Sequence, residues 1–347
     1  MSSSWKSLHM SQRLCKSLLY LRLGRPQLRS SFSSSATLAM NFARVTAWGK
    51  APQYITGGAS LPDPSPSQLQ LKLLAVGVPR VVRGRALGKH SSVKGGLPYD
   101  PSVDGVGLDE ATGNKYYITP MAAPLFAERA NVERHQIIQL SPEADPVTVA
   151  ALVNPVSSSW MALNARAIGG CKGRTIFIVG ATTESGRHAI HVAHELGAAK
   201  IVGASRTPET LDKVEGLDER IILTDSFEAP KSVGPIDIVL DFVGGPINVA
   251  IMKTAEIREI LQYISIGGVS GHEELQIPAS LLNARPIRIM GSGMGAFSMA
   301  EVKRETPGLV GLLGKMKRPL NIVTAPLATV ETVWNSTGEK QRLVQVP

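Results

Sequence analysis

The sequence is poor in the residues that build disulfide frameworks, metal cages and membrane spans. Its 347 residues include only two cysteines, Cys15 and Cys171, which excludes a disulfide scaffold and a four-cysteine zinc loop. No apolar run approaches the roughly 18 residues of a membrane-spanning helix. Aromatic residues make up 5% and do not alternate with basic ones, so nucleic-acid binding is not supported. The whole chain has 43% hydrophobic and 19% charged residues, a composition typical of a globular protein with enough core for two domains.

Acidic residues are missing altogether from positions 1–40. This segment carries six Lys and Arg side chains, which leaves the rest of the chain only about +3 of the formal charge of +9. Leu14, Leu18 and Leu21 fall on one helical face. A basic, Ser-rich, amphipathic start is typical of a mitochondrial transit peptide, and we expect a matrix location. The alternative is a disordered extension with Met40 as the working start, which implies the cytoplasm.

Residues 42 to about 150 have the pattern of short strands and turns. Positions 68–73 alternate polar and apolar residues, which predicts a half-buried strand, and 115–118 predict another. Positions 79–98 are rich in glycine and basic residues and contain no acid, so we interpret them as a loop. This part of the chain is expected to be β-rich.

From about position 150, short apolar strands alternate with helical patterns. Strands are predicted at 175–179, 200–204, 220–223, 237–240, 261–266 and 287–290, and helices at 185–196, from Pro208 onward and at 246–257. This alternation predicts an α/β fold with a parallel sheet and helices on both faces. Residues 342–346 predict a closing strand near the end of the chain.

A glycine-rich turn joins the first of these strands to its helix. Its candidate site residues are Gly180, Thr182, Thr183, Glu184, Ser185 and Gly186. Gly180 permits a tight turn, Gly186 permits close helix packing, and Ser185 is a candidate N-cap. A helix N-terminus presents free N–H groups to a pyrophosphate, so the turn predicts dinucleotide binding. The alternative is a purely structural turn between strand and helix.

The next strand ends in Ser205 and Arg206, where an NAD-binding fold usually has an acid for the ribose 2′-hydroxyl. A guanidinium suits a phosphate because its fork donates two hydrogen bonds. We therefore predict NADP(H) as the cofactor, the alternative being that Arg206 is merely a solvated side chain. His188, His191 and His194 lie three residues apart on one predicted helix, so their side chains turn around the helix axis and do not converge on a metal. This spacing favours a solvated face over a metal site.

Several segments together make the chain similar to a known family over about residues 42–347. They are 44–50, 103–107, 151–163, 180–189 and 326–331. With them the chain resembles the medium-chain dehydrogenase/reductase superfamily, in its zinc-free quinone-oxidoreductase-like branch. The resemblance implies a Rossmann doubly wound parallel sheet plus a GroES-like β-rich domain. It places the GroES-like domain at 41–155, completed by 294–347, and the Rossmann NADP-binding domain at 156–293.

The resemblance also implies a homodimer and metal-free hydride transfer from NADPH to a quinone or an α,β-unsaturated carbonyl. Two alternatives stay open: an NADP(H)-binding protein without turnover, and a biosynthetic enoyl reductase acting on thioesters, for which the basic stretch 79–98 would attract the substrate. No metal is expected, because Pro79 and Asp104 stand where zinc enzymes carry ligands. The catalytic residue is left unassigned, with Tyr99 and Ser158 as candidate proton donors.

The resemblance carries further site residues onto this sequence. Ser158 falls where the family has a hydroxyl near the nicotinamide or the phosphate. The residues implied along the ribose and nicotinamide path are Phe242, Val243, Ser265 and Ile266, with Gly291 and Ser292 beyond the last strand of the sheet. One departure concerns Thr183, which stands where the branch often has glycine, so its Cβ is expected to crowd the diphosphate.

Overall fold

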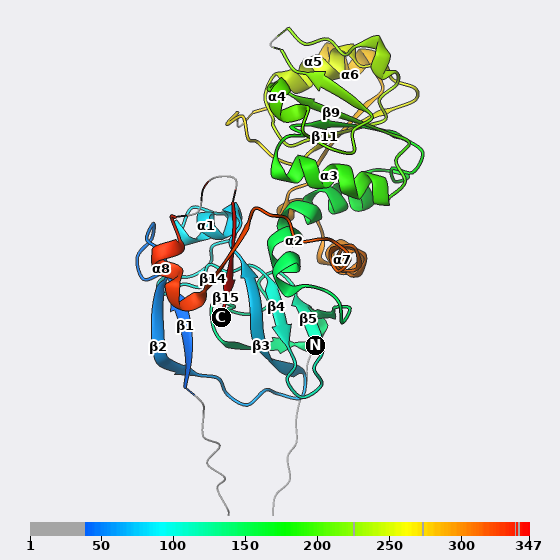
Figure 1. The fold of residues 1–347 in the computed structure, drawn as a ribbon. Helices are drawn as coiled ribbons and strands as arrows, with labels where there is room; N and C mark the ends of the chain where they lie inside the picture. The colour runs from blue at the N-terminus through cyan, green and yellow to red at the C-terminus, as the bar shows by residue number, and fades with distance from the viewer. Residues whose placement is uncertain (1–38, 225, 273, 337, 339–340) are drawn as a thin grey trace, which may run out of the picture. The chain divides into compact units, whose positions relative to one another are not determined.

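The computed structural model describes residues 39–347 apart from positions 225, 273, 337 and 339–340 (Figure 1). The predicted leader, at 1–40, lies outside the described residues except for its last two positions, which belong to the first strand, β1 (Ala39–Arg44). Among the described residues, no helix has both the length and the apolar character needed to cross a bilayer.

A six-stranded sheet forms the core of the α/β part of the chain, and all of its neighbouring strands are parallel. In spatial order they are β10 (Glu219–Ile222), β9 (Lys200–Ser205), β8 (Thr175–Val179), β11 (Ile238–Asp241), β12 (Leu261–Ser265) and β13 (Ile287–Gly291). The chain therefore starts in the middle of the sheet, moves to one edge and returns to build the other. This is the doubly wound order, and the predicted Rossmann-type sheet is confirmed.

Helices cover both faces of this sheet because the side chains of each strand alternate between them. From β8, Ile176 and Ile178 join the apolar cluster of α3 (Glu184–Glu195), whereas Phe177 and Val179 join that of α5 (Ile247–Thr254). Two shorter helices, α4 (Pro208–Leu211) and α6 (Ala279–Ala284), complete the set, and Pro208 opens α4 as predicted. Strands buried on both faces read as continuous apolar runs, which is why the sequence revealed them.

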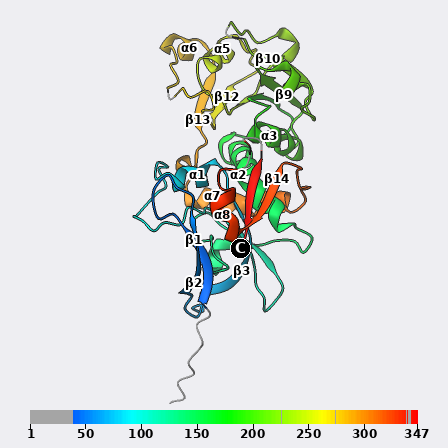
Figure 2. The ribbon, with the colours of Figure 1, turned by 60° about the vertical axis from the view of Figure 1, so that its left-hand side comes forward.

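A second sheet of seven strands draws on both ends of the described chain. Its spatial order is β14 (Ile322–Pro326), β15 (Arg342–Val346), β3 (Gln68–Gly77), β4 (Gly105–Leu108), β5 (Lys115–Ile118) and β7 (Ile137–Gln139), with β6 (Arg129–Glu133) also paired to β3. β1 pairs separately with β2 (Gln53–Ser60). Figure 2 shows the two C-terminal strands in red and orange-red, and the register of β15 places Val344 opposite Gly77 of β3.

Helix α2 (Pro146–Met161) joins the apolar clusters of the two sheets. Its N-cap is Asp145. The helix packs against β3, α3 and α7 (Met299–Leu313). The short α8 (Val330–Val333) does not belong to this group and packs against β2. The contacts are close: a Cβ on Gly77 would lie 2.2 Å from the Ala150 carbonyl oxygen, and one on Gly308 would lie 2.6 Å from the indole of Trp160. Only glycine fits at either position, so small residues set the depth at which α2 packs.

The interpretation of residues 79–98 as a loop is wrong at its start, where α1 (Arg80–Ala86) forms. Val82 is buried, and the buried Arg85 donates from Nε to the Pro101 carbonyl oxygen at 3.0 Å and from a terminal nitrogen to Ser92 Oγ at 2.8 Å. These tertiary contacts outweigh the helix penalty of Gly84. Composition alone cannot report them, because Ser92 and Pro101 are brought to α1 only by the fold.

Candidate functional site

The turn from β8 into α3 has a backbone that only glycine can form. Gly180 has φ +87°, and a Cβ there would lie 2.7 Å from Val243 Cγ2. A Cβ on Gly186 would lie 2.2 Å from the Gly180 carbonyl oxygen, because the first turn of α3 rests directly on the loop. The two glycines thus have the roles that the sequence predicts, a tight turn and close helix packing.

The helix N-cap is Thr183 and not Ser185, so that prediction is wrong. Thr183 has extended backbone angles, and its Oγ1 accepts a hydrogen bond from the Gly186 amide at 3.0 Å and donates one to the Gly180 carbonyl oxygen at 2.7 Å. The helix starts one residue before the predicted position, which places Ser185 inside its first turn. The sequence offers three hydroxyl residues in this turn, Thr182, Thr183 and Ser185, and only the backbone angles decide which one caps.

The predicted phosphate turn meets the predicted adenosine side directly. Thr182 Oγ1 lies 3.1 Å from Ser205 Oγ, and the Gly180 amide donates to the Ala204 carbonyl oxygen at 2.9 Å. Ser205 is the last residue of β9 and is buried, whereas Arg206 follows it and is exposed. The edge of the site nearest the turn therefore carries hydroxyls and a guanidinium, and the strand ends without a carboxylate.

Most of the remaining predicted residues come together at the same carboxyl edge of the sheet. Val243 contacts the Gly180 turn, and a Cβ on Gly267 would lie 2.9 Å from the Phe242 carbonyl oxygen. Ser265 ends β12 and Ile266 follows it, while Gly291 ends β13 and the Ser292 amide donates to the Ser265 carbonyl oxygen at 2.8 Å. Ser158 instead lies on α2, where its hydroxyl donates to the Pro155 carbonyl oxygen at 2.7 Å.

A buried carboxylate shapes the loop after β11, in the segment 241–245 that ends a predicted strand at the carboxyl edge. Asp241 has no exposed surface, and it accepts hydrogen bonds from the amides of Val243 at 2.8 Å and Gly244 at 2.9 Å, from Asn248 Nδ2 at 2.9 Å and from the hydroxyl of Tyr263. Burial raises the pKa of Asp241 above its usual value, against these donors. The signal was available: an acid that ends a buried strand and precedes two glycines.

A second carboxylate, Glu184, is the first residue of α3. Its Oε1 lies 3.1 Å from Nε of Arg342 on β15 and 3.3 Å from Nε2 of His188 one turn later. Burial alone would raise the pKa of Glu184, but the hydrogen bonds and charges of His188 and Arg342 prevail and lower it to about 2. His188 is thus a largely buried partner, and the solvated face predicted for it is wrong. No local pattern signals Arg342, which lies 158 positions away in sequence.

Tyr99, one of the two candidate proton donors, is enclosed by other side chains. Its ring centroid lies 5.4 Å from that of Trp48, and the guanidinium carbon of Arg85 lies 5.1 Å from the same centroid. Burial raises the pKa of Tyr99, although the charge of Arg85 opposes the effect. Its aromatic contacts give it a packing role in the β-rich part, and its role as a proton donor stays a prediction.

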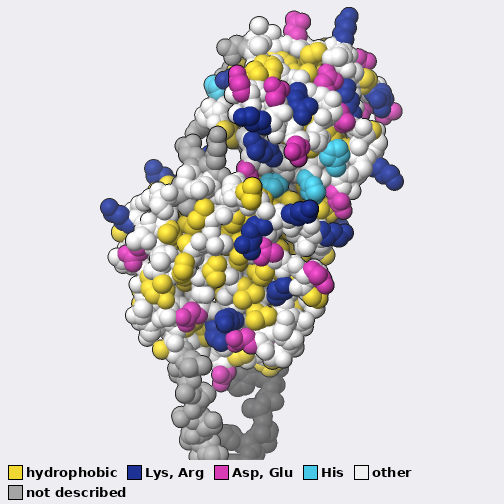
Figure 3. Space-filling model, viewed as in Figure 1, with side chains coloured by type: hydrophobic (Ala, Val, Ile, Leu, Met, Phe, Trp, Pro, Cys, Tyr) yellow, Lys and Arg dark blue, Asp and Glu magenta, His cyan; other side chains and the backbone are white. Residues whose placement is uncertain are grey.

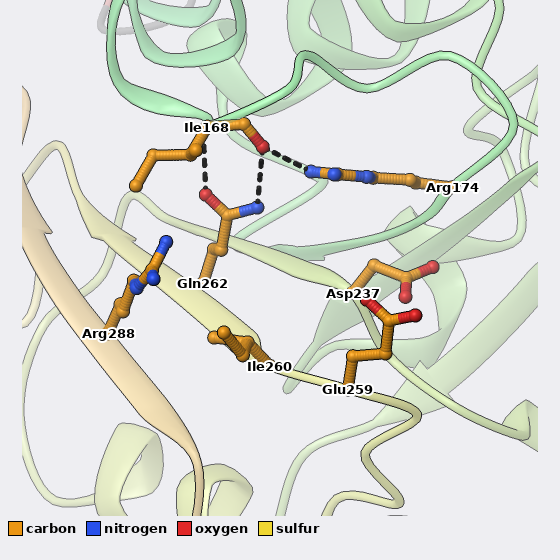
Figure 4. Close-up of a pocket in the computed structure, with 7 residues that line it drawn as sticks. All are labelled: Ile168, Arg174, Asp237, Glu259, Ile260, Gln262 and Arg288. Atoms are coloured by element: carbon orange, nitrogen blue, oxygen red, sulfur yellow. Dashed lines mark hydrogen bonds between the residues drawn. The ribbon is translucent and has the colours of Figure 1, made fainter.

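A pocket of about 200 Å³ lies at the opposite, amino edge of the parallel sheet (Figure 4). In it the amide of Gln262 pairs with both backbone groups of Ile168, at 2.7 and 3.2 Å, and Arg174 donates to the same carbonyl oxygen at 2.7 Å. Asp237 and Glu259 line one side and Arg288 the other. Because ligands of doubly wound sheets bind at the carboxyl edge, this pocket is not the dinucleotide site.

The similarity of this chain to known proteins agrees with the geometry of the site. A scan of family profiles gives no match. A curated protein of Emericella nidulans, described as "Probable NADPH-dependent quinone reductase tdiC", is 42% identical over 89% of this chain and 100% of its own length. The chain belongs to the medium-chain dehydrogenase/reductase superfamily. Within that superfamily its relative is of the quinone-reductase kind, as the resemblance predicted.

Two more distant similarities concern parts of the sequence and the fold. An acryloyl-coenzyme A reductase of Sulfurisphaera tokodaii is 26% identical over 64% of each protein. The crystal structure of the quinone oxidoreductase from Thermus thermophilus, also determined in complex with NADPH, superposes with a TM-score of 0.67 at 21% identity, over 89% of this chain and all of that one. At this identity the second similarity establishes the medium-chain dehydrogenase/reductase fold alone.

Proposed function

We propose that this protein is an NADPH-dependent, metal-free oxidoreductase that transfers hydride to a quinone or an α,β-unsaturated carbonyl. One observation carries the proposal: the glycine turn of α3 lies against Ser205, with Arg206 next to it, at the carboxyl edge of a doubly wound sheet. An NAD-specific site would end β9 in an acid. The relative at 42% identity, described as an NADPH-dependent quinone reductase, supports both the cofactor and the substrate class.

The residues present fit a phosphorylated dinucleotide. The amides of Glu184 and Ser185 lie in the first turn of α3, where no intrahelical carbonyl can accept them, so they are available to a diphosphate. Gly180 and Gly267 let the backbone pass close to Val243 and Phe242, where a Cβ would collide. Arg206 would pair with the 2′-phosphate. When bound, the nicotinamide supplies the hydride, and the surrounding residues orient it and exclude water.

Fluorescence titration of NADPH tests the proposal, because the nicotinamide signal changes on binding. Wild-type protein should bind saturably and then oxidise NADPH with a panel of quinones and enones; an unchanged signal would exclude the enzyme function. Arg206→Ala should weaken NADPH about tenfold or more and NADH far less. Lys213→Ala, an exposed cation on the loop after α4, is the matched control and should change neither. Equal losses for both cofactors would rule out the phosphate contact.

The thioester alternative has its own support in the acryloyl-coenzyme A reductase relatives. The structure changes how it should be tested. Arg85 is buried, and Arg83 donates to the Trp334 carbonyl oxygen, so replacing either would disturb packing. The exposed cations of this stretch are Arg80, Lys89 and Lys94. Loss of acyl-thioester turnover in the triple glutamine variant, with quinone turnover kept, would favour this alternative over the quinone reductase.

The alternative without turnover rests on two departures from the branch, Thr183 in the glycine turn and Pro79 where the branch often has a polar residue. The Thr183 side chain is turned toward the Gly180 carbonyl oxygen and the Gly186 amide, as a cap. Steady NADPH binding with no oxidation on the whole quinone and enone panel would favour a binding protein. We regard reduction as the better proposal, because a side chain occupied in capping α3 leaves the helix amides beside it available.

We also propose a homodimer, in which a second copy covers β13. This strand is the edge of the parallel sheet (Figure 2), and Ile289 on it and Met294 beyond it are exposed. Ile289→Lys should then yield monomers in light scattering, whereas an unchanged mass would exclude this interface.

For nucleic acid we propose no role, since Lys and Arg are interspersed with Asp and Glu on the face in Figure 3.

The mitochondrial matrix remains the proposed location, on the composition of residues 1–40. The cytoplasm is the alternative if Met40 is the start. Mass spectrometry of the endogenous N-terminus distinguishes a cleaved leader from a chain that begins at Met40.

A further inference from the structure

Glu184 is an unfavourable residue for the place it occupies. It is the first residue of α3, on the same turn whose amides face the proposed diphosphate. A carboxylate near a helix N-terminus is attracted by the helix dipole and competes there with any other anion. It also repels a diphosphate directly, the more so because the site is partly closed to water. A free Glu184 side chain would therefore weaken the binding of an anionic dinucleotide.

Arg342 holds this carboxylate from outside the α/β part of the chain. It comes from β15, the C-terminal strand of the β-rich sheet, and its Nε lies 3.1 Å from Glu184 Oε1. A second nitrogen of the same guanidinium donates to the Ala151 carbonyl oxygen on α2 at 3.0 Å. Only 16% of the Arg342 side chain is exposed, against 32% for Glu184. Two fixed partners give the guanidinium one orientation, so it can hold Glu184 in one rotamer.

We propose that Arg342 is a positioning residue for the dinucleotide: it draws the Glu184 carboxylate away from the amides of α3 and neutralises its charge. The inference rests on the proposed NADPH function. It assigns the C-terminal strand a part in cofactor affinity, through a pair that joins β15, α2 and α3. Its consequence is an asymmetry: losing Arg342 harms binding because Glu184 remains, whereas losing Glu184 as well removes the harm.

A pair that only stabilises the fold would behave differently. In that case Arg342→Gln and Glu184→Gln would each lower the melting temperature, and neither would change NADPH affinity in the folded protein. The positioning role instead predicts that one substitution weakens binding and the second restores it. His188 lies beside Glu184 and is left unchanged in every variant.

The test is a set of NADPH dissociation constants, measured by fluorescence at low salt together with melting curves of the free protein. Arg342→Gln should weaken NADPH about tenfold or more, and Arg342→Lys, which keeps the charge, should lose less. Glu184→Gln should bind as wild type or tighter. The double variant should return to within about threefold of wild type, and the Arg342→Gln defect should shrink as salt screens the carboxylate.

Arg318→Gln is the matched control, because Arg318 pairs with the carboxylate of Asp145 on another helix N-cap. It should lower the melting temperature slightly without changing NADPH affinity. The inference is overturned if wild type binds NADPH and either Arg342→Gln binds equally well or Glu184→Gln fails to rescue it. If wild type does not bind NADPH, the proposed function itself fails. If Arg342→Gln does not fold, the Arg342→Lys affinity and its rescue by Glu184→Gln decide in its place.

Discussion

Two buried aspartates receive very different numbers of hydrogen bonds from the protein. One ends a strand of the parallel sheet, and the other lies just before a strand of the β-rich sheet. Asp241, at the end of β11, is fully buried and accepts hydrogen bonds from two backbone amides, an amide side chain and a phenol. Asp104, just before β4, is 9% exposed, and Tyr117 is the hydrogen-bond donor to its carboxylate. Burial raises the pKa of both, and it raises that of Asp104 to about 7.

The difference shows what makes a buried carboxylate useful to a fold. Four donors at Asp241 replace much of the lost water, so the group fixes the loop that carries Phe242 and Val243 toward the Gly180 turn. At Asp104 a single phenol leaves the charged form poorly solvated, and the proton is retained until near neutral pH. The first aspartate organises the candidate site, whereas the second makes the β-rich sheet sensitive to pH.

The largest expected effect is that of Asp241→Ala. The substitution leaves two amides, Asn248 Nδ2 and the Tyr263 hydroxyl without their acceptor, at about 1–3 kcal/mol for each buried donor. We expect the free energy of unfolding to fall by about 5 kcal/mol, measured by urea denaturation, and the protein that remains folded to bind NADPH more weakly. A loss below about 1 kcal/mol would show that the four bonds do not hold the loop.

Asp104→Asn tests the other aspartate through pH. Because its folded pKa lies above the unfolded one, its stabilising effect is complete below about pH 4 and is lost as pH rises through 7. A shift of this size is worth up to about 4 kcal/mol. Asparagine cannot ionise, so the variant should match wild type below about pH 4, gain stability relative to wild type as pH rises to about 7, and remain the more stable at pH 8. Parallel pH profiles of unfolding free energy would contradict the assigned pKa.

Tyr117→Phe sharpens the comparison by removing the single donor at Asp104. The pKa of Asp104 should rise further, since the Tyr117 hydrogen bond is what lowers it against burial. The fall of stability with pH should then extend to higher pH, with an additional loss of about 1–2 kcal/mol at pH 8. The double variant with Asp104→Asn provides the control, because it should show no such extension.

Tyr263→Phe is expected to have the smallest effect, about 1 kcal/mol, because Asp241 keeps its other three donors. The pH profile of stability should be almost that of wild type. A larger loss than in Tyr117→Phe would reverse the comparison, since it would mean that the phenol carries the network at Asp241.

Regions whose signal is local were predictable from the sequence. The strand of β8, the glycines that follow it and the stop of α3 at Gly197 each depend on neighbours within a few residues. Gly197 has φ +77°, which glycine adopts without strain.

Features that depend on distant partners were missed or misread. The segment of α1 was predicted to be a loop because the sequence of 79–98 shows its glycine and basic residues. The sequence does not show the contacts of Arg85 with Ser92 and Pro101. His188 was placed on a solvated face because the sequence does not show that α2 packs against α3, nor that Arg342 of β15 approaches Glu184 beside it. The choice of Thr183 over Ser185 as the cap depended on one pair of backbone angles.

By itself the sequence determined the parallel sheet, the position of its phosphate turn and the absence of an acid after β9, because hydrophobic period and glycine placement act over a few residues. Only the tertiary structure decided which charges meet there. Arg342 reaches Glu184 across 158 positions, and Tyr263 of β12 reaches Asp241 of β11 across 22, because folding brings together groups that are apart in the chain. Burial then sets the strength of each pairing, and burial is a property of the assembled core.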